Sequence, residues 1–384
     1  MRAQRRRWRW AWLGTACCGG LTALLWWGQS RDGRLLARAT RVPFHLRAAD
    51  DSLHWLSDST FLVLHRSPKP YAAYVDAKTG TERRVPSLER LLQGYWWGNW
   101  WSITLSPDGH WLVGWEPEIA HDTNGEAAVE KGTMKAAFLD GSRVIKRIPS
   151  PEDKWSSGSV NPLWLPDSRH WVVLLAGQQG LYAMVESLNV PGILQKVPIG
   201  YPQGITGMSA FLGSRLLGST GPDRILATPF YAAPSVSKGP QRRISFYEFS
   251  IRPGAGIKDV RQYTVTLPKG PAPHNRDVAL RAGEEVALSP QGDRLAWLLH
   301  LRQEPDRMTR FLSRWIPWLR RAPKGAMVLR TSRLDGNDIQ DVGYMQIQPD
   351  EFLRWFQPYR LQWLPGGKRL SFLYKDAVWT VPAD

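Results

Sequence analysis

Short stretches of alternating hydrophobic and polar residues, each interrupted by a tight-turn sequence, recur along most of the chain. The clearest one runs from Trp101 to Trp115. In it Trp101, Ile103 and Leu105 alternate with polar residues, which is the two-residue period of a β-strand. Pro107-Asp108-Gly109 then supplies turn-forming residues, and a second alternating strand follows. The stretch predicts a β-hairpin.

Six hairpins of this kind are predicted, and their repetition indicates the fold class. The five other copies have their turns at Asp58, Asp167, Gly213, Gln291 and Gly366, of which the copy at Gly213 is the faintest. Successive turns are 46 to 78 residues apart. A repeat of about this length accommodates four strands and is typical of a β-propeller. We therefore expect an all-β protein, a six-bladed β-propeller of four-stranded antiparallel blades.

The two ends of the repeat region complement each other. Residues 36–47 have the pattern of a strand, whereas the last repeat reaches Asp384 one strand short of a full blade. Propellers avoid open sheet edges, so we predict that residues 37–46 form the outermost strand of the last blade. The propeller domain is then 35–384.

This closure orients the chain. The N-terminal strand enters from the side that carries the hairpin turns. The opposite side should carry the links between blades and the loops between second and third strands. Three of those loops are predicted to be long, namely Glu116–Thr133, Gly221–Pro240 and Gln303–Lys324.

The repeat also resembles a known family. A strand, the turn Ser106-Pro-Asp-Gly109, further strands and a closing Asp335-Gly336 resemble the WD40-like "PD40" repeats of TolB-type propellers. The resemblance covers most of residues 50–384 and implies the propeller fold. We expect this chain to lack the α/β domain that precedes the propeller in TolB. Because the family's signature residues are turn formers, the resemblance implies no catalytic residue.

Residues 1–34 are interpreted as a targeting segment. An arginine-rich start is followed by the uncharged run Ala11–Gly28, which is nearly long enough to cross a bilayer. Tryptophans flank the run on both sides, as in an interfacial aromatic belt. We predict an uncleaved signal anchor in the inner membrane, single-pass through residues 11–28, with the propeller on the periplasmic side. A cleaved signal peptide is the alternative.

Charge and cysteine content limit the partners and the disulfides that the propeller can be expected to have. The net charge of +16 would suit an anionic partner, but no basic stripe or nucleic-acid-binding motif accompanies it, so no nucleic acid is expected. The two cysteines, Cys17 and Cys18, both precede the propeller, which should therefore contain no disulfide. They also resemble a lipoprotein box, although Gly14 stands where a branched apolar residue is usual.

Aromatic residues recur in the predicted links between blades. These are Trp96, Trp97, Trp100, Trp155 and Trp355, at positions that should border the channel mouth. Two interpretations remain open. The side chains either line a ligand-binding mouth or pack between blades.

A basic amphipathic stretch, Arg307–Arg321, lies within the last long loop. It has helical spacing and contains Arg314, Trp315, Trp318 and Arg320. It either covers a blade edge, docks a partner protein, or lies on a membrane.

Enzyme signatures are missing from the sequence. It contains no Gly-x-Ser-x-Gly, His-Glu-x-x-His or phosphate-loop motif, and His121–Glu126 is an incomplete calcium loop. We therefore expect no catalytic residue, cofactor or metal, and a non-enzymatic scaffold or sensor that binds a protein, peptide or envelope polymer. The alternative is a glycan lyase or hydrolase at the channel mouth, which a histidine paired with a carboxylate would favour.

Overall fold

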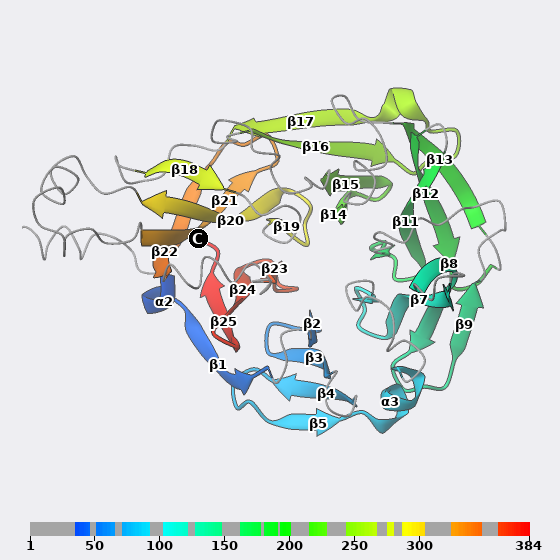
Figure 1. Ribbon diagram of the computed structural model, residues 1–384, viewed down its shortest axis with the longest axis horizontal. Helices are drawn as coiled ribbons and strands as arrows, with labels where there is room; N and C mark the ends of the chain where they lie inside the picture. The colour runs from blue at the N-terminus through cyan, green and yellow to red at the C-terminus, as the bar shows by residue number, and fades with distance from the viewer. Residues whose placement is uncertain are drawn as a thin grey trace, which may run out of the picture.

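The computed structural model describes fourteen stretches of the chain, and within them the strands form six antiparallel sheets around a central axis (Figure 1). The described residues are 35–46, 51–65, 71–92, 103–121, 127–147, 162–177, 180–190, 193–200, 215–228, 243–266, 275–279, 286–303, 324–347 and 360–384. The predicted six-bladed propeller is confirmed.

The first three blades follow one another in chain order from the innermost strand to the outermost. Blade 1 contains β2 (Ser52–Trp55), β3 (Thr60–His65), β4 (Tyr71–Asp76) and β5 (Glu82–Arg84), followed by α3 (Pro86–Leu92). Blade 2 contains β6 (Thr104–Leu105), β7 (Trp111–His121), β8 (Ala127–Phe138) and β9 (Val144–Arg147). Blade 3 contains β10 (Leu163–Trp164), β11 (His170–Gly177), β12 (Gly180–Ser187) and β13 (Ile193–Gly200).

The remaining blades complete the ring. Blade 4 contains β14 (Arg215–Gly221), β15 (Arg224–Thr228), β16 (Arg243–Ser250), the short 3-10 helix η2 (Ile257–Asp259) and β17 (Arg261–Thr266). Blade 5 contains β18 (Asn275–Ala279), β19 (Val286–Leu288), β20 (Arg294–Gln303), β21 (Lys324–Arg333) and β22 (Gln340–Ile347). Blade 6 contains β23 (Gln362–Trp363), β24 (Arg369–Tyr374), β25 (Ala377–Pro382) and β1 (Thr40–His45), which α2 (Leu35–Arg38) precedes.

The N-terminal strand closes the ring, as the sequence predicted. β1 pairs antiparallel with β25, with Thr40 opposite Thr380 and His45 opposite Ala377. The blue and red ends of the chain therefore lie side by side in Figure 1. The β25 edge, which would otherwise be open, is covered. Arg38 secures the entry point because its guanidinium donates to the backbone carbonyls of Val342 and Asp384.

The hydrophobic core lies between the blades. Six clusters of buried side chains each draw residues from two neighbouring blades, one cluster for each junction of the ring. Tryptophan side chains contribute polar links across these junctions. Trp164 Nε1 donates to the Thr104 carbonyl at 3.1 Å, and Trp363 Nε1 donates to the Ala287 carbonyl at 3.0 Å. Inter-blade packing is therefore the role of the hairpin tryptophans that the structure describes.

The hairpin turn of blade 4 was predicted in the wrong place. The turn is formed by Pro222-Asp223, between β14 and β15, and Gly221 lies opposite Arg224. The residues after Gly213 form the first strand of the blade, not the second. Pro222 fixes φ and Asp223 favours a turn, so Gly221-Pro222-Asp223 has stronger turn chemistry than Gly213-Ser214. The predicted loop Gly221–Pro240 is accordingly wrong in part, since 224–228 is strand and 229–242 lies outside the described residues.

The predicted loop Glu116–Thr133 is largely a β-ribbon. β7 and β8 remain paired far beyond the blade, with Glu116 opposite Thr133 and His121 opposite Ala127. The two halves of the predicted loop pair with each other as far as His121 and Ala127, so the connecting loop is only 122–126. Blade 5 differs from a four-stranded blade in another way, because β18 adds a fifth strand alongside the far end of β20.

The structure describes no part of the predicted membrane segment, residues 11–28. Of the helices that it does describe, none has the length and apolar character needed to cross a bilayer.

Candidate functional site

The nine residues proposed from the sequence as a contact surface lie outside the described residues. They are Trp96, Trp97, Trp100, Trp155, Arg314, Trp315, Trp318, Arg320 and Trp355. The flanking strands identify the connection that one of their segments makes. Gln303 ends β20 and pairs with Lys324 at the start of β21, so 304–323 joins the second and third strands of blade 5, as predicted.

One side of the ring carries the turns between first and second strands, and we call it the turn face. These turns hold one another. The backbone N–H of Gly366 in blade 6 donates to Asp58 Oδ1 in blade 1 at 2.8 Å. The backbone N–H of Asp108 in blade 2 donates to Ser168 Oγ in blade 3 at 3.0 Å. Each bond ties two neighbouring blades.

Glycines allow the turns of blades 4, 5 and 6 to approach equally closely. Gly292 has φ +75, and a Cβ there would lie 2.4 Å from the Ser219 carbonyl oxygen of the preceding blade. Gly367 has φ +69, and its Cβ would meet the Gln291 side chain at 2.3 Å. A side chain at Gly292 would collide with the backbone of the preceding blade, and one at Gly367 would displace the Gln291 side chain. The turn face is therefore compact and braced around the ring.

The opposite side, which we call the loop-rich face, carries the long extensions. In blade 2, β7 and β8 stay paired from Trp111↔Phe138 to His121↔Ala127, which extends this hairpin beyond the other strands of the blade. Blade 5 carries the other long hairpin, in which β20 and β21 pair over ten residue positions, from Arg294↔Arg333 to Gln303↔Lys324. Blades 2 and 5 occupy opposite positions in a ring of six, so the two projections flank the axis of the propeller.

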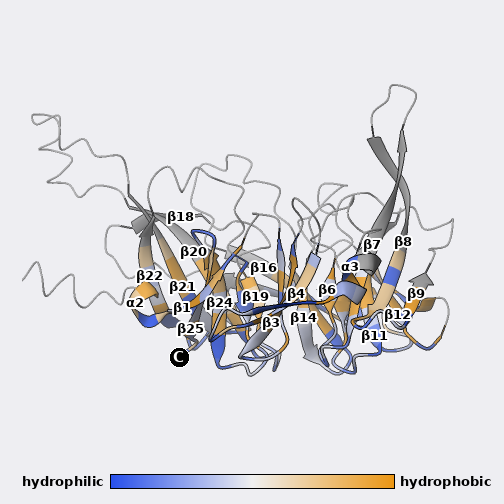
Figure 2. Ribbon diagram, turned by 90° about the horizontal axis from the view of Figure 1, so that it is seen from below, coloured by the Kyte–Doolittle hydropathy of each residue, from blue (hydrophilic) through white to orange (hydrophobic). Residues whose placement is uncertain are grey.

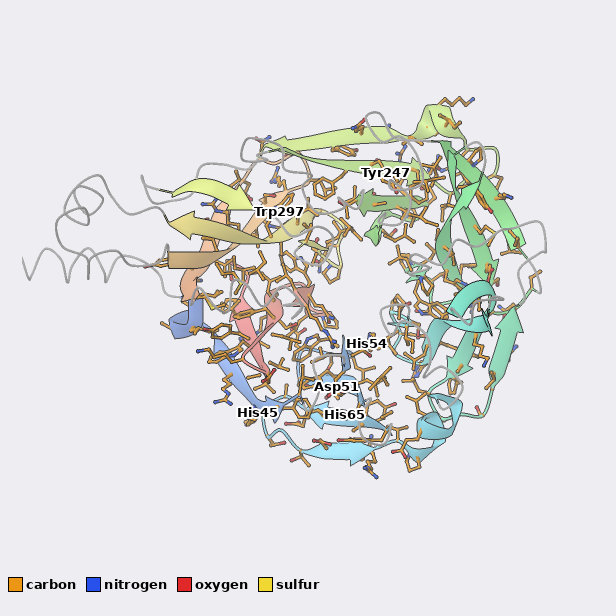
Figure 3. The ribbon with its side chains drawn as sticks, viewed as in Figure 1. His45, Asp51, His54, His65, Tyr247 and Trp297 are labelled. Carbon is orange, nitrogen blue, oxygen red and sulfur yellow. The ribbon has the colours of Figure 1, made fainter. Side chains whose placement is uncertain are left out.

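A buried histidine–carboxylate pair lies at the loop-rich end of blade 1. Asp51 precedes β2 and His65 ends β3, and the antiparallel register places them together. His65 Nδ1 is 2.9 Å from Asp51 Oδ2, and both side chains have no exposed surface. Figure 3 shows the two residues close together, with His54 nearby in the same blade.

Aromatic rings enclose His65. The Tyr71 ring stacks on the imidazole with centroids 4.2 Å apart, and Phe44 of β1 lies tilted at 6.0 Å. The Tyr71 hydroxyl donates to Glu82, while the Arg84 guanidinium lies over the Tyr71 ring, 4.3 Å from its centroid. The pair is thus sealed between strands of blade 1 and the strand that closes blade 6.

His54 lies one layer nearer the channel, on β2. Its Nε2 is 3.1 Å from Ser52 Oγ. Loss of hydration lowers the pKa of His54 from 6.5 to about 4, with a smaller contribution from the positive charge of Arg360. Arg360 itself has a left-handed backbone with φ +46. His54 is therefore neutral at physiological pH.

The geometry of the His65–Asp51 pair is that of an oriented imidazole. A carboxylate holds Nδ1, and Nε2 has no hydrogen-bond partner among the described residues. Catalysis would require a substrate to reach Nε2, and both side chains are fully buried in the structure. The pair joins the end of β3 to Asp51, the residue that precedes β2. The described stretches contain no cluster of three or more histidine, cysteine or acidic side chains suited to a metal ion.

Sequence analysis missed this pair, although the hairpin pattern contained a signal. Centring the blade 1 turn on Asp58 sets the β2–β3 register, in which Ser52 faces Leu64. Extending that register by one residue places Asp51 opposite His65. A histidine and an aspartate at one hydrophobic hairpin end therefore predict contact.

Comparison with known proteins yields likeness in fold only. No family model matches the chain, and no curated protein does. Similar solved structures include TolB from Acinetobacter baumannii, with 8% identity over 86% of this chain and 65% of that one, at a TM-score of 0.41. A Mycobacterium tuberculosis puromycin-hydrolyzing peptidase has 13% identity over 89% of this chain and 46% of that one, at 0.42. The Cps50 (Swd1) β-propeller domain of Myceliophteria thermophila has 11% identity over 90% of this chain and 97% of that one, at 0.37.

The chain spans less than two thirds of the TolB and peptidase chains. The ring of six antiparallel blades is the architecture that the resemblance to TolB-type, WD40-like propellers implied. Identities and scores of this size carry no argument about activity.

Proposed function

We propose that this protein is a membrane-anchored, extracytoplasmic β-propeller that binds a protein, peptide or envelope polymer as a non-enzymatic scaffold or sensor. Residues 11–28 would hold it in the inner membrane, with the propeller on the periplasmic side. The loop-rich face would be the contact surface.

The contrast between the two faces supports this proposal most directly. On the turn face, short turns are bonded to one another, as in the Asp58–Gly366 and Asp108–Ser168 contacts. On the loop-rich face, the β7–β8 ribbon and the β20–β21 hairpin project from opposite blades. Binding residues concentrate on extensions that a rigid scaffold holds in place. The propeller has this arrangement.

Site-specific photo-crosslinking in intact cells tests the contact surface. A photo-reactive amino acid replaces Lys131 on the β7–β8 ribbon, and the matched control replaces Asn189, an exposed residue in the turn between β12 and β13. We expect crosslinked products of higher mass from position 131 and none from position 189. Products from position 189 alone, or no product from position 131, would contradict the proposal.

The enzyme alternative rests on one observation, the His65–Asp51 pair. It predicts that the purified full-length chain turns over a glycan library and that His65→Gln abolishes the turnover. Because both side chains are buried, we expect no turnover in either protein. Turnover that His65→Gln removes would replace the scaffold proposal with the enzyme.

A further inference from the structure

Six large aliphatic side chains are exposed in the described part of the chain. They are Val144, Val190, Ile193, Leu194, Ile257 and Ile339, with exposed fractions from 37% to 60%. Aliphatic side chains scattered singly over a surface are ordinary and need no explanation. These six are not scattered.

All six occupy the same topological position. Each lies in the connection between the third and fourth strands of its blade, or within the first two residues of the fourth strand. Val144 begins β9, Val190 and Ile193 flank the start of β13, and Ile339 directly precedes β22. Ile257 lies in the connection between β16 and β17. Blades 2 to 5 thus each present an aliphatic group at the outer rim of the ring.

Strand direction relates this rim to the turn face. Strands alternate in direction within a blade, so the third-to-fourth connection leaves on the same side as the first-to-second turn. Backbone bonds confirm this in three blades, where Leu139 donates to His110, Leu188 to Arg169, and Ile251 to Asp223. The rim therefore borders the turn face.

The described chain begins and ends near this face. β1 begins at Thr40, opposite the end of β25, and Arg38 contacts the C-terminal Asp384. Figure 2 shows α2 and the C-terminus on the side away from the β7–β8 ribbon. Residues 1–34, which include the uncharged run Ala11–Gly28, join the propeller here. A tether to the membrane anchor proposed above would therefore start near the turn face.

We propose that the turn face lies against the bilayer surface and that the aliphatic rim of blades 2 to 5 contacts the boundary between headgroups and acyl chains. This inference deepens the proposed function and rests on its membrane anchor. It orients the propeller, so that the loop-rich face points away from the membrane. Partial insertion of aliphatic side chains is the contact that interfacial proteins use.

Charge on this face favours a contact made by aliphatic groups rather than by headgroup charge. Exposed Asp58, Asp140 and Asp167 occur in the same turns as, or beside, exposed Arg143 and Arg169. Both signs are interspersed, so neither an anionic nor a cationic surface is specifically attracted. A bilayer of phosphatidylcholine alone should therefore suffice, and added salt should not release the contact.

Fluorescence quenching in nanodiscs tests this orientation in the full-length chain. Cys17→Ser and Cys18→Ser remove the native thiols, and Ile193→Cys or Ile257→Cys then provides one labelling site for an environment-sensitive dye. The control is His45→Cys, because His45 is exposed at the other end of β1. Phosphatidylcholine nanodiscs carry a nitroxide quencher at a shallow depth. A dye on native Cys17, in a Cys18→Ser chain with a deep quencher, reports the anchor.

We expect loss of fluorescence at positions 193 and 257 and none at position 45. Quenching at Cys17 without quenching at 193 and 257 would overturn the orientation while leaving the anchor of the proposed function intact. Quenching at position 45 equal to that at 193 and 257 would also overturn it. Absence of quenching at Cys17 would overturn the anchor and this inference together.

Discussion

The Asp58 carboxylate accepts a hydrogen bond of 2.8 Å from the backbone N–H of Gly366, although 308 residues separate them. The bond joins the turn of the first blade to the turn of the last. It joins blade 1 to blade 6, the blade that β1 completes by pairing with β25. Two independent contacts, one polar and one a strand pair, thus close the ring at its seam.

Removing the Asp58 acceptor should weaken the seam. Asp58→Ala is expected to lower the free energy of unfolding by about 1 kcal/mol, the usual net worth of a hydrogen bond. Asp58→Asn keeps an acceptor oxygen and should cost less. Urea unfolding followed by tryptophan fluorescence measures both. Equal stability of Asp58→Ala and the native chain would show that the bond contributes nothing.

Filling a close approach at the same seam should cost more. A Cβ on Gly80 would lie 1.9 Å from the Pro43 carbonyl oxygen of β1, and its φ is +72. The matched control is Gly254→Ala, which has φ +81 and nothing within 4 Å. The control should lose about 1 kcal/mol through backbone strain. Gly80→Ala should lose roughly 3 kcal/mol or more, since overpacking is added to the strain.

The pH dependence of stability should reveal His54. Its pKa is lowered from 6.5 to about 4, so the unfolded chain binds the proton more tightly than the folded one. The free energy of unfolding should therefore be unaffected by His54 above pH 6.5 and should fall as the pH drops from 6.5 toward 4. The size of the pKa shift limits this loss of unfolding free energy to about 3 kcal/mol. His54→Gln should flatten the stability profile across this range, and an unchanged slope would contradict the assignment.

Breaking the buried pair in blade 1 should destabilise the fold. Asp51→Ala leaves the Nδ1 of a fully buried His65 without this acceptor, and should lower the free energy of unfolding by about 2 kcal/mol. Asp51→Asn retains an acceptor oxygen and should lose less. Thermal unfolding should give the highest midpoint temperature for the native chain, a lower one for Asp51→Asn and the lowest for Asp51→Ala. If Asp51→Ala is as stable as the native chain, the pair does not fasten the end of β3.

The native cysteines report the membrane anchor without any substitution. Both cysteines, Cys17 and Cys18, lie within the predicted span 11–28. A membrane-impermeant maleimide should label the protein only after detergent is added. Labelling of intact membranes would place the span outside the bilayer. Loss of both thiols from the mature chain would instead indicate a cleaved signal peptide.

The fold could be predicted because short sequence patterns define each of its hairpins. The turn residues Pro107-Asp108-Gly109 and the alternating strands beside them define a hairpin, and repetition of the hairpin defines the ring. The closing strand followed from counting strands in the last repeat. The hairpin at Gly213 was predicted wrongly because Gly213-Ser214 resembles a turn between two apolar stretches, whereas the stronger turn residues Pro222-Asp223 form the turn.

The candidate site was less predictable because it depends on contacts between blades and between strands. The His65–Asp51 pair requires the hairpin register, and its enclosure requires Phe44 from the opposite end of the chain. The bond between Asp58 and Gly366 joins the first and last blades, so it could be predicted only once the closed ring was known. The tryptophans chosen from the link sequences lie outside the described residues, so their role stays a prediction.

The position of β1 has a mechanical consequence for a protein anchored as proposed. Tension on the N-terminal tether would act along the axis of β1, whose ladder bonds to β25 run perpendicular to that axis. Such a force shears all of these bonds at once and does not peel them one by one. The strand that completes the sheet would then also be the part of the molecule that bears load.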